Sequence, residues 1–180
     1  MIGIVLLVVL ISFGVVIAYA IYSTNADVVS EVKVLNPEGE GGTALVIYHP
    51  GLSDFQYKVT LAFAQGLVSN GWRVEITTAS SQAPADLTRY DLLVLGSPTY
   101  GGKPAPSIER YLSRVGDLGH KRIAIIGTGA GSNPATESMK SLAQAANGSV
   151  VESLTFFTMA PNEGDPVEMA TQAGKEVPLP

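Results

Sequence analysis

Short apolar runs alternate with amphipathic segments along most of the chain. The runs at residues 44–48, 92–95 and 123–126 are continuously apolar, which is typical of strands buried on both faces of a sheet. Residues 72–77 alternate apolar and polar side chains, as in a strand with one covered face at a sheet edge. Together with the apolar residues 150–157, the pattern predicts five short strands.

The segments between these strands have helical spacing. A helix is predicted over residues 55–67, with Asn70-Gly71 as its C-terminal stop. A second helix begins near Pro106, and a third follows Asn133-Pro134, which supply a cap and a first-turn proline. A short final helix is expected over residues 165–175. Strands that alternate with helices predict an α/β domain with a five-stranded, parallel, doubly wound sheet.

The first 22 residues carry no charged side chain. Residues 2–21 form an apolar run of about the 20 residues that a helix needs to cross a bilayer. A cleaved signal peptide is the alternative, because Ala18-Tyr19-Ala20 resembles a small-residue cleavage site. The run is longer than a signal core and no Lys or Arg precedes it, so a retained single-pass transmembrane helix over residues 1–22 is favoured.

Residues 23–43 are predicted to be a linker between this helix and a domain at residues 44–180. The linker contains the run Pro37-Glu38-Gly39-Glu40-Gly41-Gly42 and a short β-like patch at residues 32–35, so we expect it to let the domain stand off the membrane. Lys33 is the basic residue nearest the helix, on its C-terminal side. Because positive charge favours the cytoplasmic flank, a cytoplasmic domain is expected.

The amino-acid composition excludes several classes of partner and of catalytic or metal site. The net charge of −5 falls entirely after Tyr22, so the domain is acidic and would repel nucleic acid while favouring basic protein partners. The absence of cysteine excludes disulfides, thiol catalysis and cysteine-held metal clusters. With only two histidines, His49 and His120, a histidine-rich metal site is not expected.

Candidate chemistry lies in three glycine-containing loops that follow predicted strands, at residues 49–55, 96–103 and 127–133. Ligands of open parallel sheets bind at the carboxyl ends of the strands, where the strand order reverses. Three backbones could therefore approach one ligand closely. No Ser-His-Asp arrangement or paired carboxylates are assembled in these loops, so no catalytic residue is assigned.

The segment Gly96-Ser97-Pro98-Thr99-Tyr100-Gly101-Gly102 resembles the middle flavin-contacting loop of the flavodoxin family, and the order of elements agrees. The resemblance implies a sheet order of 2-1-3-4-5 and FMN as cofactor. The first loop would surround the phosphate through Gly51, Leu52, Ser53, Asp54 and Phe55. The other two would hold the isoalloxazine ring through Ser97, Pro98, Thr99, Tyr100, Gly101, Gly102, Thr128, Gly129, Ala130 and Gly131.

Tyr100 is the expected stacking aromatic, the alternative being a tyrosine that fixes its own loop. The first loop departs from the family pattern, because Pro50 lacks a donor and Asp54 adds a like charge near the phosphate. Ser53 and Gln56 have the spacing of a capping box, which would occupy the same amide donors. Either phosphate displaces this cap, with His49 as a possible cationic neighbour, or the loop stays closed and FMN binds weakly.

The sequence therefore predicts a membrane-tethered flavodoxin-like protein that binds FMN. It would transfer electrons to or from a membrane-associated redox partner protein or quinone. An electron-transfer flavoprotein is favoured over an oxidoreductase that turns over its own substrate. Two alternatives stay open: an NAD(P)H:quinone or FMN-dependent reductase, and a non-redox interaction module that has lost flavin binding.

Overall fold

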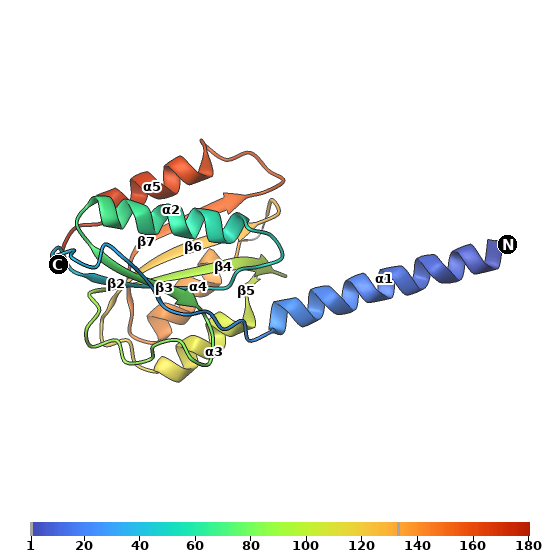
Figure 1. Cartoon of the computed structure of the whole chain (residues 1–180), viewed down its shortest axis with the longest axis horizontal. Coiled ribbons are helices and arrows are strands. Elements are labelled where there is room, and N and C mark those ends of the chain that lie inside the picture. Colours follow the sequence, from blue (N-terminus) through green and yellow to red (C-terminus); the bar gives the residue numbers. More distant parts are fainter. Residues whose placement is uncertain (1, 133) are drawn as a thin grey trace.

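A computed structural model describes residues 2–132 and 134–180. Asn133, which the sequence suggests as a helix cap, lies outside the described residues. The elements, labelled in Figure 1, are α1 (Ile2–Asn25), β1 (Lys33–Leu35), β2 (Thr43–Tyr48), α2 (Phe55–Ser69), β3 (Arg73–Thr78), β4 (Leu92–Tyr100), β5 (Lys103–Pro104), α3 (Pro106–Val115), β6 (Arg122–Gly129), α4 (Thr136–Ala145), β7 (Ser149–Phe157) and α5 (Pro166–Glu176).

The sheet is doubly wound, as the sequence predicts. Its strands lie in the order β1-β3-β2-β4-β6-β7, and β3, β2, β4, β6 and β7 run parallel in the expected order 2-1-3-4-5. The described residues add two short strands to the predicted five. β1 pairs antiparallel with β3, and β5 pairs antiparallel with β4. β3 is therefore not the free edge that its alternation suggested, because β1 covers it.

The core lies in two layers, one on each face of the sheet. Helices α2 and α5 pack together on one face, where the core includes Phe63, Leu67 and Trp72. Helices α3 and α4 cover the other face, around Ile108 and Met139. Neighbouring residues of β4 point into opposite layers, which is why its sequence is apolar at consecutive positions.

The segment expected to be a free linker is partly hydrogen-bonded to the domain. The Ser30 side chain bonds to those of Thr77 and Thr78 at 3.1 Å each, just before β1 adds to the sheet. Asp27 accepts hydrogen bonds from the backbone and side chain of Ser81 at 3.0 and 2.6 Å. The chain between α1 and β1 therefore lies along the sheet edge.

Within the described residues, one helix is long and apolar enough to cross a membrane. The most apolar 18-residue window of α1 has a mean hydropathy of 3.0, and none of that window is buried against the rest of the chain. Figure 1 shows α1 projecting away from the domain on the side toward which β4 points. By length and composition this helix is able to cross a membrane, a property that it shares with signal sequences.

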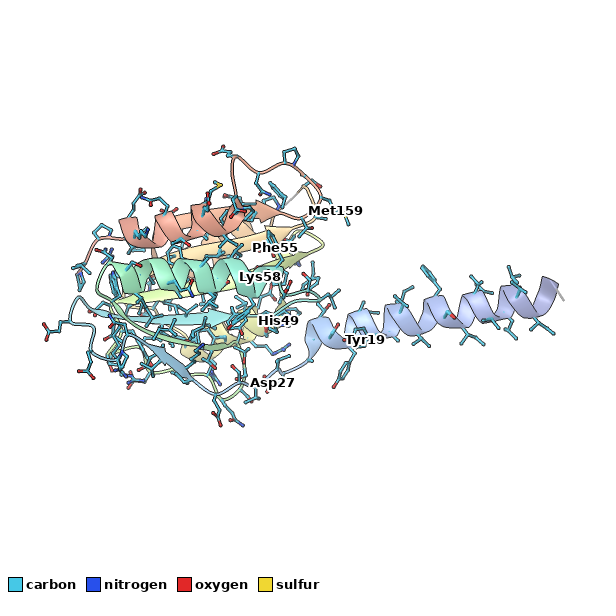
Figure 2. All side chains as sticks on the ribbon, turned by 45° about the horizontal axis from the view of Figure 1, so that its top comes forward. Tyr19, Asp27, His49, Phe55, Lys58 and Met159 are labelled. Carbon is cyan, nitrogen blue, oxygen red and sulfur yellow. The ribbon has the colours of Figure 1, made fainter. Side chains whose placement is uncertain are left out.

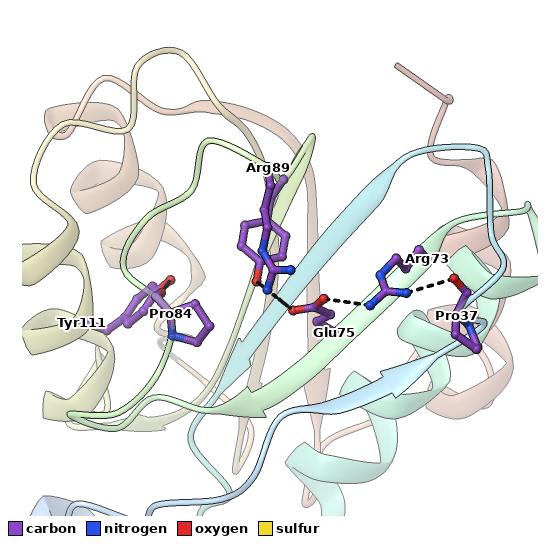
Figure 3. Close-up of polar contacts among 7 residues, drawn as sticks. Pro37, Arg73, Glu75, Pro84, Arg89 and Tyr111 are labelled. Carbon is purple, nitrogen blue, oxygen red and sulfur yellow. Dashed lines mark hydrogen bonds and ion pairs between the residues drawn. The ribbon is translucent and has the colours of Figure 1, made fainter.

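A buried carboxylate links β3 to the segments around it (Figure 3). Glu75 is 2% exposed, and its Oε2 accepts from Arg89 at 2.7 Å and from the Tyr90 hydroxyl at 2.8 Å. Arg73 contacts Oε1 at 3.3 Å and also donates to the Pro37 carbonyl at 2.9 Å. Burial, followed by the hydrogen bond to Glu75, raises the pKa of Tyr90 to about 12.

Candidate functional site

A cavity of about 140 Å³ lies where the three predicted loops meet at the carboxyl ends of β2, β4 and β6. Tyr48 pairs with Gly96 and Ser97 with Gly127, so the three strands end at one level. Ten of the predicted site residues line the cavity: Gly51, Leu52, Ser53, Phe55, Pro98, Thr99, Tyr100, Thr128, Gly129 and Ala130. The others, Asp54, Ser97, Gly101, Gly102 and Gly131, lie outside its lining.

Within the described residues, the capping residue of α2, Asp54, makes no side-chain hydrogen bond to the N-terminus of that helix. Its carboxylate instead pairs with Lys58 at 2.7 Å and is 69% exposed. The negative charge that the sequence places near the loop is thus partnered and turned outward, and the first-turn amides of α2 remain available to a ligand.

The predicted capping box between Ser53 and Gln56 is wrong. Gln56 is 2% exposed and donates from Nε2 to Thr60 Oγ1 at 2.9 Å and to the Ile126 carbonyl at 3.2 Å. Its Oε1 accepts from Thr128 Oγ1 at 2.8 Å. The amide faces β6 rather than its own helix terminus, and it fixes Thr128 in the cavity wall.

The middle loop is a tight hairpin between β4 and β5. Tyr100 pairs with Lys103, and Gly101 and Gly102 form the two-residue turn with φ of +59° and +80°. Such turns need positive φ at both central positions, so the turn itself accounts for both glycines. Ser97 is fully buried and accepts from the Ala105 amide at 2.8 Å. These residues shape the loop that carries Pro98 to Tyr100 into the cavity wall.

Tyr100 and His49 meet beside the cavity. Their ring centroids are 6.2 Å apart with the planes nearly perpendicular, and the Tyr100 hydroxyl is buried. Burial raises the pKa of Tyr100, and the nearby Thr24 of α1 acts in the opposite direction. The ring is therefore packed against its own domain, with the end of α1 next to it.

His49 is buried rather than poised as a cation. It is 2% exposed, and Nδ1 shares a hydrogen bond with Ser107 Oγ at 3.0 Å. Burial lowers the pKa of His49 below its ordinary 6.5, and the charge of Arg110 lowers it further. The imidazole is neutral near pH 7, which removes the hypothesis that it pairs with a phosphate as a cation.

The third loop gains a partner that the sequence did not indicate. The amides of Thr158 and Met159 donate to the carbonyls of Gly129 and Ala130 at 2.9 and 2.8 Å, so the end of β7 folds onto this loop. Thr158 joins Gln56 and Pro50 as lining residues outside the predicted set. Leu52 and Met159 are 58% and 87% exposed, and Figure 2 places Met159 on the side from which α1 extends.

Several solved flavodoxin structures have the same fold. A flavodoxin from the domain Archaea aligns with a TM-score of 0.65 at 16% identity, over 75% of this chain and 95% of its own. The flavodoxin of Megasphaera elsdenii aligns with a TM-score of 0.62 at 16% identity. The alignment covers 74% of this chain and 99% of that protein's chain. The flavodiiron protein from Giardia intestinalis gives 0.62 at 17% identity, over 77% of this chain and 35% of its own.

No protein-family model and no curated protein matches this sequence. At identities below 20%, the structural likeness defines the fold and leaves the ligand to be argued from the residues. Strand order, helix placement and these neighbours agree, so the domain has a flavodoxin-like fold.

Proposed function

We propose that this protein is a single-pass membrane protein whose domain binds FMN and transfers electrons to or from a partner at the membrane. The observation that carries the proposal is the meeting of three strand-end loops at one cavity, beside an α2 N-terminus that its own capping residue, Asp54, does not cap with its side chain. Flavodoxins of the same fold add support.

The residues present fit the phosphate end of such a ligand. Helix N-termini bind phosphate through unpaired backbone amides and the helix dipole. Here the 15-residue helix α2 offers its first turn, Ser53 adds an exposed hydroxyl, and Lys58 balances the charge of Asp54. The unfavourable charge of Asp54 that the sequence suggested is therefore compensated by Lys58 in the first turn of α2.

The ring end would rest mainly on an open rim. The cavity of about 140 Å³ is smaller than the roughly 300–1,000 Å³ of pockets that enclose a drug-sized ligand. We assign ring contact to the backbone of Thr99, Gly129 and Ala130, with Tyr100 as the nearest aromatic. FMN, when bound, supplies the electron-transfer chemistry. The chain orients it, and the acidic domain disfavours added negative charge on it.

The membrane assignment rests on α1 and on where it joins the domain. The Asn25 carbonyl at the end of α1 accepts from Arg110 at 3.2 Å, and α1 leaves from the side that carries the cavity. Tethering there would raise the effective concentration of the site near a membrane-bound redox protein or quinone. With Lys33 on the domain side of α1, the domain is proposed to be cytoplasmic.

The substitution Gly129→Ala tests the cavity as the flavin site. A Cβ at this position would lie 3.4 Å from Thr99 Oγ1 and 3.9 Å from the Phe157 ring, ordinary contacts that the fold accommodates. Gly129 and Thr99 both line the cavity, so a methyl group between them takes up space there, and we expect FMN affinity to fall about tenfold, or about 1.4 kcal/mol. Flavin fluorescence during titration of the full chain in detergent measures it.

Gly164→Ala is the matched control, because its Cβ would also meet only ordinary contacts, 3.5 Å from Met169, outside the cavity lining. Its FMN affinity should equal that of the parent chain. Equal affinities for all three proteins would place any flavin site elsewhere.

A non-redox module is the second candidate, and the small cavity together with the hairpin explanation for Gly101 and Gly102 favours it. The absence of any FMN saturation in the parent chain would support this candidate over flavin binding.

A further inference from the structure

A second cavity, of about 430 Å³, lies beneath the end of α1. Its wall is formed by the Ser80-Ser81 turn after β3, by one side of α3, and by Asn25 and Asp27 from the connection to α1. Its lining shares no residue with the cavity at the ends of β2, β4 and β6. We propose that this second cavity binds the phosphate group of an anionic lipid headgroup and thereby docks the domain on the membrane.

The charges that line the cavity suit a single anion. Arg110 and Arg114 face one carboxylate, Asp27, so the lining carries a net charge of +1. Asp27 is already engaged, because its oxygens accept from the amide and hydroxyl of Ser81. These hydrogen bonds, and then the two arginines, hold the pKa of Asp27 below its usual range, so it stays ionised beside them.

The arginines are held in place by backbone carbonyls. Arg114 donates to the carbonyls of Ser81 and Ala83, and Arg110 donates one N–H to Asn25. A guanidinium has five N–H donors and binds phosphate oxygens through a planar fork. Arg110 in particular can contact a ligand while it keeps its bond to α1.

An unpartnered hydroxyl supplies an independent sign of a ligand. Ser80 lines the cavity and is 5% exposed, and its Oγ has no hydrogen-bond partner among the described residues. A buried polar group left unpaired costs about 1–3 kcal/mol. A change of the Ser80 χ1 rotamer would turn this hydroxyl toward the cavity, where it could donate to a phosphate oxygen and the cost would be removed.

The position of Arg110 relative to the bilayer indicates that the phosphate belongs to a lipid. The apolar run ends near Tyr22, and a rise of about 1.5 Å per residue puts Asn25 about 4.5 Å farther along the helix axis. The headgroup layer on each side of a bilayer is roughly 5–8 Å thick. Arg110, bonded to Asn25, therefore lies at the level of the lipid phosphates. This step rests on α1 spanning the membrane, as proposed above.

Native mass spectrometry of the full chain, released from detergent micelles that contain equal amounts of phosphatidylglycerol and phosphatidylcholine, tests the proposal. We expect one phosphatidylglycerol to be retained per chain, about tenfold in preference to phosphatidylcholine. Arg110→Gln should abolish most of this preference, because it removes a charge-assisted hydrogen bond. Ser80→Ala should lower it without disturbing the fold, since only a hydroxyl is lost.

Lys140→Gln is the matched control, because it removes a surface cation of α4 that pairs with Glu137 outside the cavity. Its lipid preference should equal that of the parent chain. Equal retention of both lipids, or a loss in Lys140→Gln as large as in Arg110→Gln, would overturn the proposal. So would inorganic phosphate at millimolar concentration displacing the retained lipid completely, since the cavity would then be a site for free phosphate.

A separate experiment, extraction with alkaline carbonate, tests whether α1 anchors the chain in the membrane. If α1 does not span the membrane, the chain will leave membranes in alkaline carbonate, and the proposed function fails in that part. A chain that resists carbonate yet shows no lipid preference overturns only the headgroup site. Neither result depends on FMN.

Discussion

At the scale of single residues, His49 shows how burial decides chemistry. Its position in a strand-end loop suggested a cation for phosphate, yet it lies under Tyr100 and bonds to Ser107. With the pKa of His49 lowered by burial, the unfolded chain binds a proton more readily than the folded chain does. The stability that this histidine contributes is present above pH 6.5 and is lost as the pH falls through the lower, folded pKa.

His49→Asn should therefore flatten part of the acid limb of the stability profile. Urea unfolding of the full chain, followed by the fluorescence of the single, fully buried Trp72, gives the free energy of unfolding at pH 7.5 and pH 5.5. We expect a smaller difference between the two values in the variant than in the parent chain. His120→Asn, at an exposed histidine, should keep the parent's difference. An unchanged difference in His49→Asn would contradict the neutral, buried assignment.

Sequence reasoning is weakest at this scale. The sequence suggested Gln56 as a capping residue because a capping box is recognised by local spacing alone. Its observed partners Ile126 and Thr128 lie in strand β6, far along the chain. Likewise, Ser80 and Arg110 lie 30 positions apart and meet only because β3 and α3 are brought together. Polar contacts made across elements leave no periodic signal along the chain.

At the scale of elements, the apolar pattern sufficed for the main architecture. The five parallel strands follow from runs that alternate with helical segments, whereas their order was what the resemblance to flavodoxins implied. β1 and β5 could not be predicted from the sequence, because strands of three and two residues are too short to show an alternating pattern. β1 nevertheless changes the role of the connection after α1, since it covers the edge of β3. The contacts of Glu75 with Arg73 and Arg89 tie β3 to the segments beside it (Figure 3).

Glu75→Ala should test how firmly this edge is held. Breaking a buried ion pair is costly, but Arg89 and Arg73 are 61% and 31% exposed and can be rehydrated. We expect the free energy of unfolding to fall by about 1–3 kcal/mol, measured by Trp72 fluorescence in urea. Glu40→Ala, at an exposed glutamate in the same part of the chain, should change it by less than about 0.5 kcal/mol. Similar losses in both variants would rule out a specific role for the cluster.

At the scale of the whole molecule, each cavity has a lining residue on the side from which α1 extends: Figure 2 labels Phe55 of the first cavity and Asp27 of the second there. The domain carries a net charge of −5, so an anionic membrane repels it as a whole. A local cationic cavity beside α1 would offset that repulsion at one face and set the orientation of the domain. The proposed flavin edge would then be held toward the membrane, where a quinone or redox protein could approach it.

The central claim is that the loops at the ends of β2, β4 and β6 bind FMN with its phosphate at the N-terminus of α2. Parallel titrations of the full chain with FMN and with riboflavin, which lacks the phosphate, test it most directly. The account predicts saturable binding of one FMN per chain and riboflavin affinity at least about tenfold weaker. Equal affinity for both, or no binding of either, would contradict it.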